Sequence, residues 1–258
     1  MSPFKNKQVI VADMDGTLTP SREEVSDEML QTIKKLLKHY KFAILGGGTL
    51  KLFEKQILNK LMPQLSPDEE SNLFILPCSG TKAYTGTFND AKRYIDYYNF
   101  YSEELSPLER IQIKKVIDEF RKKIRKEVTW GNSYDDRGSQ ITLPILGLDA
   151  PLELKKQFDP DRSKRLKYAR WLQKQLPWCE ITVGGTSSID ITRKGLNKGY
   201  GIRQLCKLLL CEFKDIIFFG DALEKGGNDY PVKRLVDTIA VKDDKETLKY
   251  FKRELRRK

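Results

Sequence analysis

The sequence predicts an α/β protein, in which a parallel sheet is covered by helices on both faces and is interrupted by an inserted α+β module. Strand-like apolar runs alternate with helical stretches at both ends of the chain. The first run, at residues 8–12, is continuous rather than alternating, which is typical of a strand buried on both faces. The middle has longer, more charged helices and amphipathic or isolated strands. We expect a sheet domain at 1–85 and 187–258, with the module at 86–186.

The elements of the N-terminal part follow from apolar runs and capping signals. The strand at 8–12 precedes a helix that begins near Ser26, an N-cap residue type, and ends near Tyr40. The next elements expected are a strand at 41–45 that ends at three glycines, a helix at 49–61 and a strand at 73–76.

The C-terminal part repeats this alternation. The elements expected there are a helix at 197–210, strands at 215–219 and 236–241, and a final helix rich in Lys and Arg. The inserted module is expected to contain helices at 106–126 and 161–175 and strands at 140–146, 180–183 and 188–192.

The composition bounds the class of protein. Lys and Arg outnumber Asp and Glu by 47 to 36, and the net charge of +11 favours anionic partners. The four cysteines form no C-x-x-C pair and the chain has one histidine, so free thiols are expected rather than a zinc site. The first residues lack the apolar core of a signal peptide, and no stretch approaches the ~20 apolar residues of a membrane span. We expect a cytoplasmic protein without a membrane partner.

The basic C-terminal segment raises nucleic-acid binding as an alternative class of function. Residues 249–258 are rich in Lys and Arg, and Phe251 and Leu255 lie four positions apart. These two side chains would pack on the sheet domain and leave the cations in solvent, as on most charged helices. The sequence contains no recognised nucleic-acid module, so no specific nucleic-acid partner is expected.

Carboxylates follow two of the predicted parallel strands. Asp13 and Asp15 follow the first strand, at residues 8–12. Asp221 follows the apolar strand expected at 215–219. Ligands of open α/β sheets bind beyond the carboxyl ends of the strands, so these acids are expected at one sheet edge. Packed carboxylates repel each other unless a cation compensates, and Mg²⁺ suits oxygen ligands and phosphate substrates. Taken singly, Asp-Gly at a strand end is an ordinary turn.

Three motifs at the two ends of the chain resemble those of the haloacid dehalogenase superfamily of phosphohydrolases and phosphomutases. The segment D-M-D-G-T-L-T at 13–19 is similar to the D-x-D-G-T signature. The residues G-D at 220–221 and G-G-N-D at 226–229 are similar to the closing acidic motif. Lys198, at the start of a helix between them, stands where the superfamily places its lysine. The resemblance implies a Rossmann-like core with an inserted cap domain.

The resemblance also implies catalytic roles for three residues. Asp13 would be the nucleophile that forms an aspartyl phosphate. Asp15 would protonate the leaving oxygen and then deprotonate the incoming water or hydroxyl. Lys198 would neutralise charge on the phosphoryl oxygens and on Asp13, in keeping with the positioning and charge neutralisation that phosphoryl transfer requires.

The cofactor implied by the resemblance is Mg²⁺. Its ligands would be Asp13, the backbone carbonyl of Asp15 and Asp221, with Asn228 and Asp229 in or next to the coordination shell. These residues come from the first and the last of the three motifs, so the site requires both ends of the chain to meet.

The second motif of the superfamily departs from its usual form. A Ser or Thr normally ends the second strand and binds the phosphoryl group, whereas this chain has L-G-G-G-T at 45–49. Thr49 is the nearest hydroxyl, and it is also suited to cap the following helix. Backbone amides of the glycines are the alternative phosphate ligands.

The position of the insertion, after the third strand, and its α+β character resemble the capped subclass IIB, with a cap of type C2B. Within it, several segments are similar to the eukaryotic-type phosphomannomutases. The segment G-G-T-S-S-I-D at 184–190 resembles the part of that family's cap that binds substrate, which implies roles for Ser188 and Asp190. Arg137 stands where the family has a phosphate-binding arginine; its alternative role is a surface ion pair with neighbouring aspartates.

The phosphate-binding side chains of the cap then indicate whether the protein is a hydrolase or a mutase. A mutase needs a second phosphate site as good as the first, and arginine forks supply such sites. Here Lys126 and Pro144 stand where the family has further arginines. We therefore expect a Mg²⁺-dependent phosphatase acting on a sugar phosphate or similar small phosphorylated metabolite, with phosphomannomutase as the alternative. Related proteins often dimerise through the cap, so a homodimer is expected by analogy alone.

Overall fold

The chain folds into two compact units, seen in a computed structural model that describes residues 2–124 and 129–258. The first unit consists of Met1–Ser102, Lys198–Glu224 and Asp229–Lys258, and the second of Glu103–Asn197 and Lys225–Asn228. The first unit is therefore assembled from both ends of the sequence.

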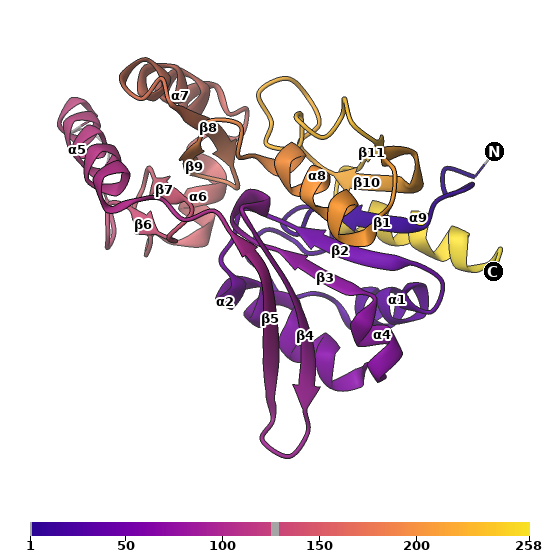
Figure 1. Cartoon of the computed structure of the whole chain (residues 1–258). Coiled ribbons are helices and arrows are strands. Elements are labelled where there is room, and N and C mark those ends of the chain that lie inside the picture. The colour runs from indigo at the N-terminus through magenta and orange to yellow at the C-terminus, as the bar shows by residue number, and fades with distance from the viewer. Residues whose placement is uncertain (1, 125–128) are drawn as a thin grey trace. The chain divides into compact units, whose positions relative to one another are not determined.

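A seven-stranded sheet with the order β11-β10-β1-β2-β3-β4-β5 forms the first unit (Figure 1). Neighbouring strands from β11 to β3 are parallel, which confirms the predicted parallel sheet, and β4 and β5 are added antiparallel to its edge. The strands are β1 (Val9–Ala12), β2 (Lys41–Leu45), β3 (Leu73–Leu76), β4 (Lys82–Asn89), β5 (Tyr94–Ser102), β10 (Ile216–Gly220) and β11 (Asp237–Ala240).

Helices cover both faces of this sheet because the side chains of its central strands are apolar on both sides. On β1, Ile10 and Ala12 pack in a core cluster with residues of α1 and α9, whereas Val9 and Val11 pack with residues of α8. The helices of this unit are α1 (Asp27–Leu37), α2 (Leu50–Phe53), α3 (Asn59–Leu61), α4 (Pro67–Ser71), α8 (Lys198–Leu209) and α9 (Asp244–Leu255).

The helical run after β2 contains an irregular turn. Thr49 caps α2, and its hydroxyl oxygen accepts a hydrogen bond from the amide of Leu52 at 3.3 Å. Between α2 and α3 lies the π-helical turn η1 (Glu54–Leu58), so the single helix expected at 49–61 is interrupted by one wider turn. Such turns are frequent near functional sites.

The inserted unit has different bounds from those expected. Residues 82–102 were expected to belong largely to the insertion, but β4 and β5 form a hairpin that extends the core sheet, and Tyr84 and Tyr97 pack against its core. At the other end, β9 pairs with β7 and β8, which keeps residues 188–193 in the inserted unit. The insertion thus begins at Glu103 instead of residue 86 and ends at Asn197 instead of residue 186.

The second unit is an α+β fold around a four-stranded antiparallel sheet with the order β6-β7-β9-β8. Its elements are α5 (Pro107–Lys123), β6 (Asp135–Asp136), β7 (Ile141–Pro144), α6 (Leu152–Phe158), α7 (Ser163–Gln175), β8 (Cys179–Gly184) and β9 (Ser188–Arg193). Side chains such as Ile117, Leu143 and Leu172 form its own core. Helix α6 was not expected, because it is only seven residues long and none of its side chains is fully buried.

An ion pair joins α5 to β9 in this unit. Arg193 donates from Nε and Nη2 to the two carboxylate oxygens of Glu109, each at 2.9 Å. The hydrogen bond from Arg193 lowers the pKa of Glu109 from 4.5 to about 2, and the hydrogen bonds of Glu109 with Ser106 at the helix N-terminus add to the effect. A lowered pKa in the folded state means that the pair stabilises the protein above pH 4.5 and loses its effect as pH falls toward 2.

Glu109→Gln is therefore expected to lower the free energy of unfolding by about 1 kcal/mol at neutral pH, a value reduced for solvent screening of the half-exposed pair. Glutamine keeps the helix cap, so the change isolates the charge. Urea unfolding as a function of pH measures this loss in the free energy of unfolding. The difference from the wild type should vanish under strongly acidic conditions. Glu212→Gln is the control, because Glu212 and Lys214 are 72% and 73% exposed. A pH-independent loss in Glu109→Gln would contradict the assignment.

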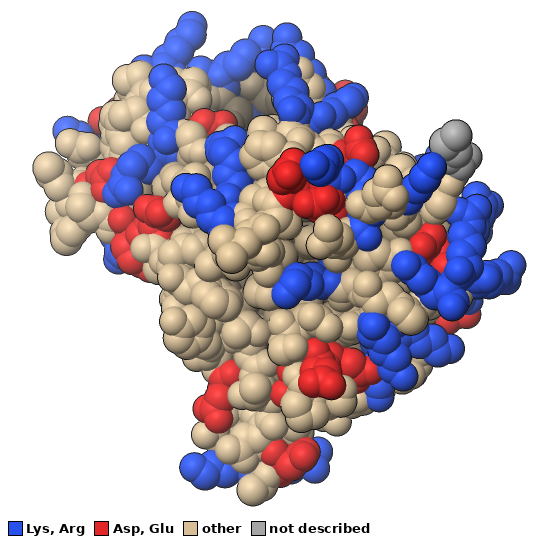
Figure 2. Space-filling view, turned by 45° about the vertical axis from the view of Figure 1, so that its right-hand side comes forward, with Lys and Arg blue, Asp and Glu red and all other residues tan. Residues whose placement is uncertain are grey.

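The molecular surface mixes charges of both signs. On the face shown in Figure 2, Lys and Arg are scattered among Asp and Glu, with a denser basic group at the right-hand edge. On α9, Phe251 is fully buried in the core and Leu255 packs against it, as expected for a helix that rests on the sheet domain. All four cysteines are free thiols. Among the described residues, no helix has both the length and the apolar character needed to cross a bilayer.

Candidate active site

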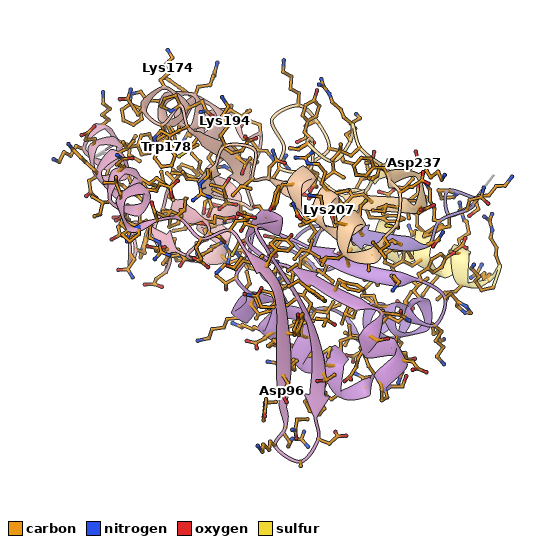
Figure 3. All side chains as sticks on the ribbon, viewed as in Figure 1. Asp96, Lys174, Trp178, Lys194, Lys207 and Asp237 are labelled. Atoms are coloured by element: carbon orange, nitrogen blue, oxygen red, sulfur yellow. The ribbon has the colours of Figure 1, made fainter. Side chains whose placement is uncertain are left out.

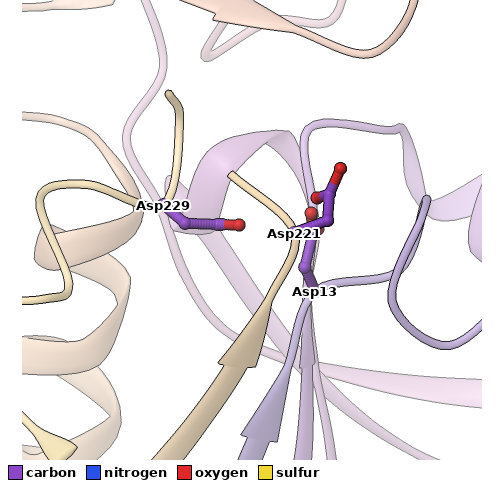
Figure 4. A group of neighbouring side chains, drawn as sticks. All are labelled: Asp13, Asp221 and Asp229. Carbon is purple, nitrogen blue, oxygen red and sulfur yellow. The ribbon is translucent and has the colours of Figure 1, made fainter. Parts of the chain in front are cut away.

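Two parallel neighbours of the sheet carry aspartates directly after their last residues. Ala12 of β1 is in register with Phe219 of β10, and the amide of Asp13 donates to the carbonyl of Phe219 at 2.9 Å. Asp13 and Asp221 therefore emerge side by side at the carboxyl edge of the sheet (Figure 4). Together with Asp229 they form a cluster in which one carboxylate oxygen of each lies within 4.8 Å of the others.

Lys198 lies inside this cluster. Its ammonium group is 2.8 Å from Oδ1 of Asp13 and 2.5 Å from Oδ1 of Asp229, and the residue is 1% exposed. Lys198 is the first residue of α8, where the helix dipole disfavours a cation. Burial lowers the pKa of Lys198, but the carboxylates of Asp13 and Asp229 more than compensate and raise it above its ordinary value.

Asp229 is held by both of its oxygens. Oδ1 accepts from Lys198 and Oδ2 accepts from the amide of Ala222 at 3.1 Å, and the residue is fully buried. A Cβ atom at Gly220 would lie 2.4 Å from Oδ2 of Asp229, so only glycine leaves room for this carboxylate. The glycine before Asp221 is thus part of the packing of the cluster.

The carboxylate of Asp13 is oriented by donors on one oxygen. Oδ1 accepts from the amide of Met14 at 2.8 Å and pairs with Lys198. Burial raises the pKa of Asp13 well above its ordinary value, and repulsion from Asp229 and Asp221 adds to this, although Lys198 opposes it. The cluster carries more negative than positive charge, which is the condition under which a bound cation stabilises carboxylates.

Gly16 brings the turn after β1 against Asp221. Its φ of +82° is in the left-handed region, and a Cβ atom there would lie 2.8 Å from Oδ2 of Asp221. The turn is closed by the amide of Gly16, which donates to the carbonyl of Thr19 at 2.7 Å.

Gly16→Ala is expected to lower catalytic turnover about 10- to 100-fold, because the new methyl group displaces the carboxylate of Asp221. It should also cost about 1–2 kcal/mol of stability from left-handed backbone strain. Gly195→Ala is the matched control, since Gly195 has a φ of +84° but no atom within 4 Å of the added Cβ. Both variants should lose stability in thermal unfolding. For the phosphatase expected from the sequence, only Gly16→Ala should lose activity toward p-nitrophenyl phosphate. Equal activity losses would contradict this assignment.

Asp15 lies in the same turn and is half-buried. Its Oδ1 accepts from the amide of Arg22 at 2.7 Å and from Nε2 of Gln56 at 3.0 Å. Neither Arg22 nor Gln56 was among the expected site residues. Arg22 has a φ of +66°, a conformation that the sequence does not signal for an arginine, and the position of Gln56 depends on the π-helical turn.

The first glycine after β2, Gly46, lies close to Asp13. A Cβ atom at Gly46 would be 3.5 Å from Oδ1 of Asp13, and the Gly46 carbonyl accepts from the amide of Ser79. Thr49 is three residues further on and caps α2, the alternative role that its sequence context offered. A role of Thr49 in binding a phosphoryl group stays a prediction.

The structure divides the expected site residues between the two compact units. Those in the first unit are Asp13, Asp15, Thr49, Lys198, Asp221 and Asp229. Those in the second are Arg137, Ser188, Asp190 and Asn228, and their roles in binding substrate or metal stay predictions. Lys126, which was considered as a further phosphate ligand, lies outside the described residues.

Within the second unit, Arg137 and Asp190 are both engaged by neighbours. The side chain of Arg137 is 4% exposed and donates from Nε to Asp135 at 2.7 Å, so the pair is more buried than the surface contact considered from sequence. Asp190 is 4% exposed and accepts from the hydroxyl of Thr142 at 2.7 Å. Ser188 begins the same strand, β9, and is half-buried.

A buried lysine among three carboxylates, at the carboxyl edge of a parallel sheet, is a site for a hard cation and an anionic ligand. Residues 10–251 match the family of haloacid dehalogenase-like hydrolases. The chain belongs to this family, which confirms the resemblance of its three motifs.

Curated relatives include phosphomannomutases. The phosphomannomutase of Saccharomyces cerevisiae is 28% identical over 234 residues, which cover 88% of this chain and 85% of the yeast protein. That of Oryza sativa subsp. indica is 26% identical over 261 residues and 95% of each chain. The solved structure of N-terminally truncated Plasmodium falciparum IMP-nucleotidase with bound IMP has a TM-score of 0.72 at 16% identity, over 98% of this chain and 69% of that one. At that identity the likeness establishes the fold alone.

Proposed function

We propose that this protein is a Mg²⁺-dependent phosphatase that hydrolyses a small phosphomonoester, of the sugar-phosphate class, through an aspartyl phosphate on Asp13. The observation that carries the proposal is the convergence of Asp13, Lys198, Asp221 and Asp229 at one sheet edge. A covalent nucleophile, a buried cation and clustered oxygen ligands are the groups that phosphoryl transfer requires.

The residues of the cluster fit Mg²⁺. Carboxylate oxygens are the ligands this ion prefers, and Asp13, Asp221 and Asp229 each place one within 4.8 Å of the others. Burial raises the pKa of Asp13 and repulsion from Asp229 and Asp221 adds to this, and a divalent cation would stabilise the charged carboxylate. Asp13, Asp221 and the backbone carbonyl of Asp15 would hold the ion. Asp229 fits a supporting position, because both of its oxygens already accept hydrogen bonds. When bound, Mg²⁺ would neutralise charge on the phosphoryl oxygens.

The remaining steps follow from the side chains. Lys198 and the Met14 amide engage Oδ1 of Asp13, which leaves Oδ2 to attack phosphorus. As the bond between phosphorus and the leaving oxygen breaks, Asp15 donates its proton to that oxygen. Asp15 then takes a proton from the water that attacks the aspartyl phosphate, and phosphate leaves with Asp13 regenerated. Lys198 offsets the negative charge of the phosphoryl group throughout.

The arginines of the second unit favour hydrolysis over mutase activity. A mutase must bind a second phosphate group tightly, yet Arg137 is paired with Asp135. Other arginines of this unit that donate to groups of the same unit are Arg110, Arg121, Arg165 and Arg193. Guanidinium groups engaged in this way are less available for a second phosphate, whereas a phosphatase needs only the site at Asp13.

Phosphomannomutase is the second candidate, supported by the 28% identity with the yeast enzyme over most of the chain. One experiment separates the two functions. The protein is incubated with Mg²⁺, mannose 1-phosphate and a catalytic amount of hexose bisphosphate, and both inorganic phosphate and mannose 6-phosphate are measured. Phosphate release without isomerisation supports the phosphatase. Conversion to mannose 6-phosphate without phosphate release overturns it in favour of the mutase.

A further inference from the structure

Gln56 is a buried polar side chain in a helical stretch whose other fully buried residues are apolar. The residue is 1% exposed, and its neighbours Phe53, Ile57 and Leu58 are fully buried. Burying an amide costs free energy unless its groups find hydrogen-bond partners. A leucine would carry no such cost, so the contacts of the amide are what glutamine contributes at this position.

The amide of Gln56 donates to the segment that follows β1. Nε2 lies 3.0 Å from Oδ1 of Asp15, 3.2 Å from Oγ1 of Thr19 and 3.0 Å from the carbonyl oxygen of Glu23. Its Oε1 is buried and has no hydrogen-bond partner among the described residues. The carboxylate of Asp15 and the carbonyl of Glu23 only accept, so the reverse orientation of the amide would set oxygen against oxygen. The chemistry of the acceptors therefore fixes which end of the amide faces Asp15.

The backbone of Gln56 is anchored to the same segment. Its carbonyl oxygen accepts from the amide of Val25 at 2.8 Å. This carbonyl lies in the π-helical turn η1, whose wider hydrogen-bond pattern releases helix carbonyls to outside partners. Gln56 thus contacts both ends of the segment 15–25. Its side chain donates to Asp15, and its backbone carbonyl accepts from Val25.

Both hydrogen bonds to the carboxylate of Asp15 engage Oδ1, one from Gln56 and one from the amide of Arg22. We propose that Gln56 is a positioning residue that holds Asp15 by Oδ1 so that Oδ2 performs the proton transfers. This inference rests on the proposed function, in which Asp15 is the acid and base. The proton on Oδ2 passes to the leaving oxygen as its bond to phosphorus breaks, and Oδ2 later accepts one proton from the attacking water.

The test compares two leaving groups in Gln56→Met, which keeps the length of the side chain and removes its donors. The p-nitrophenolate of p-nitrophenyl phosphate departs without a proton, whereas the alkoxide of mannose 6-phosphate requires one. We expect kcat/KM for mannose 6-phosphate to fall about 10- to 100-fold more than for p-nitrophenyl phosphate, with the loss in kcat and little change in KM. The ratio of the two kcat/KM values does not depend on the fraction of folded protein. Partial misfolding of the variant therefore does not change this ratio.

Ile57→Val is the matched control, a small change to a fully buried neighbour in the same turn, and it should leave this ratio unchanged. Asp15→Asn should shift the ratio in the same direction as Gln56→Met. A Gln56→Met protein with the wild-type ratio would overturn the role of Gln56 while leaving the phosphatase intact. A wild-type protein that hydrolyses neither ester with Mg²⁺ would overturn the phosphatase itself, and the inference about Gln56 with it.

Discussion

Asp13→Asn is expected to reduce phosphatase activity about 10⁴-fold or more, the order of loss seen when a covalent nucleophile is removed. The amide has the shape of the carboxylate but cannot form an acyl phosphate. Release of p-nitrophenolate in the presence of Mg²⁺ measures the effect. Mass spectrometry of the acid-quenched protein should show a phosphorylated species in the wild type and none in the variant.

The stability of Asp13→Asn separates catalysis from folding. Burial and the repulsion from Asp229 and Asp221 hold the pKa of Asp13 above its ordinary value. The folded state therefore disfavours the charged carboxylate, and this cost develops as pH rises above the ordinary pKa of 3.8 and is complete above the raised pKa. A neutral isostere removes this cost, and Lys198 keeps its ion pair with Asp229 at 2.5 Å. The metal-free variant should therefore unfold at a temperature at least as high as the wild type. A folded Asp13→Asn variant that keeps most of the wild-type activity would contradict the nucleophile assignment.

Lys198→Met is expected to have the largest effect on stability. The ammonium group is buried between Asp13 and Asp229, and methionine replaces its length without its charge. Removing one partner of a buried ion pair leaves uncompensated charge and costs about 3–5 kcal/mol. Activity should fall about 10²- to 10³-fold as well, because charge on the phosphoryl group is no longer offset. Urea unfolding in EDTA measures the stability loss.

Mg²⁺ provides a second measurement on this variant. A divalent ion among Asp13, Asp221 and Asp229 would replace part of the lost positive charge, so Mg²⁺ should stabilise Lys198→Met more than the wild type. Lys207→Met is the matched control, since Lys207 is exposed on the same helix, α8 (Figure 3). It should change neither stability nor activity measurably. Equal effects of the two substitutions would contradict the burial of positive charge at position 198.

The sequence was sufficient to predict the central sheet and part of the site because both depend on local signals. Continuous apolar runs of four or five residues predicted β1, β2, β3 and β10, and the parallel arrangement then placed the residues after β1 and β10 at one edge. The meeting of Asp13 with Asp221 follows from that arrangement. The ion pair of Lys198 with Asp13 was expected through the family resemblance, since a lysine at a helix start is otherwise most often solvated.

Other features depend on tertiary contacts that the sequence does not signal. The β4–β5 hairpin alternates in polarity like a strand of the inserted module, and only its pairing with β3 assigns it to the core. The position of Gln56 arises from a π-helical turn, which shifts the side chains after it by one place relative to a regular helix. The left-handed backbone of Arg22, which directs an amide at Asp15, likewise has no sequence signal.

The interrupted course of the first unit has a consequence for its biosynthesis. During translation, β1 can pair with β2 once both strands have left the ribosome. Its other neighbour, β10, emerges only after all of Glu103–Asn197. Until then the flank of β1 is an open edge with unpaired backbone groups, the kind of surface on which nascent chains aggregate. The inserted unit is largely continuous and can fold in the meantime. The acidic cluster therefore forms only after residues 221 and 229 have been synthesised, and any product that stops before residue 229 lacks it.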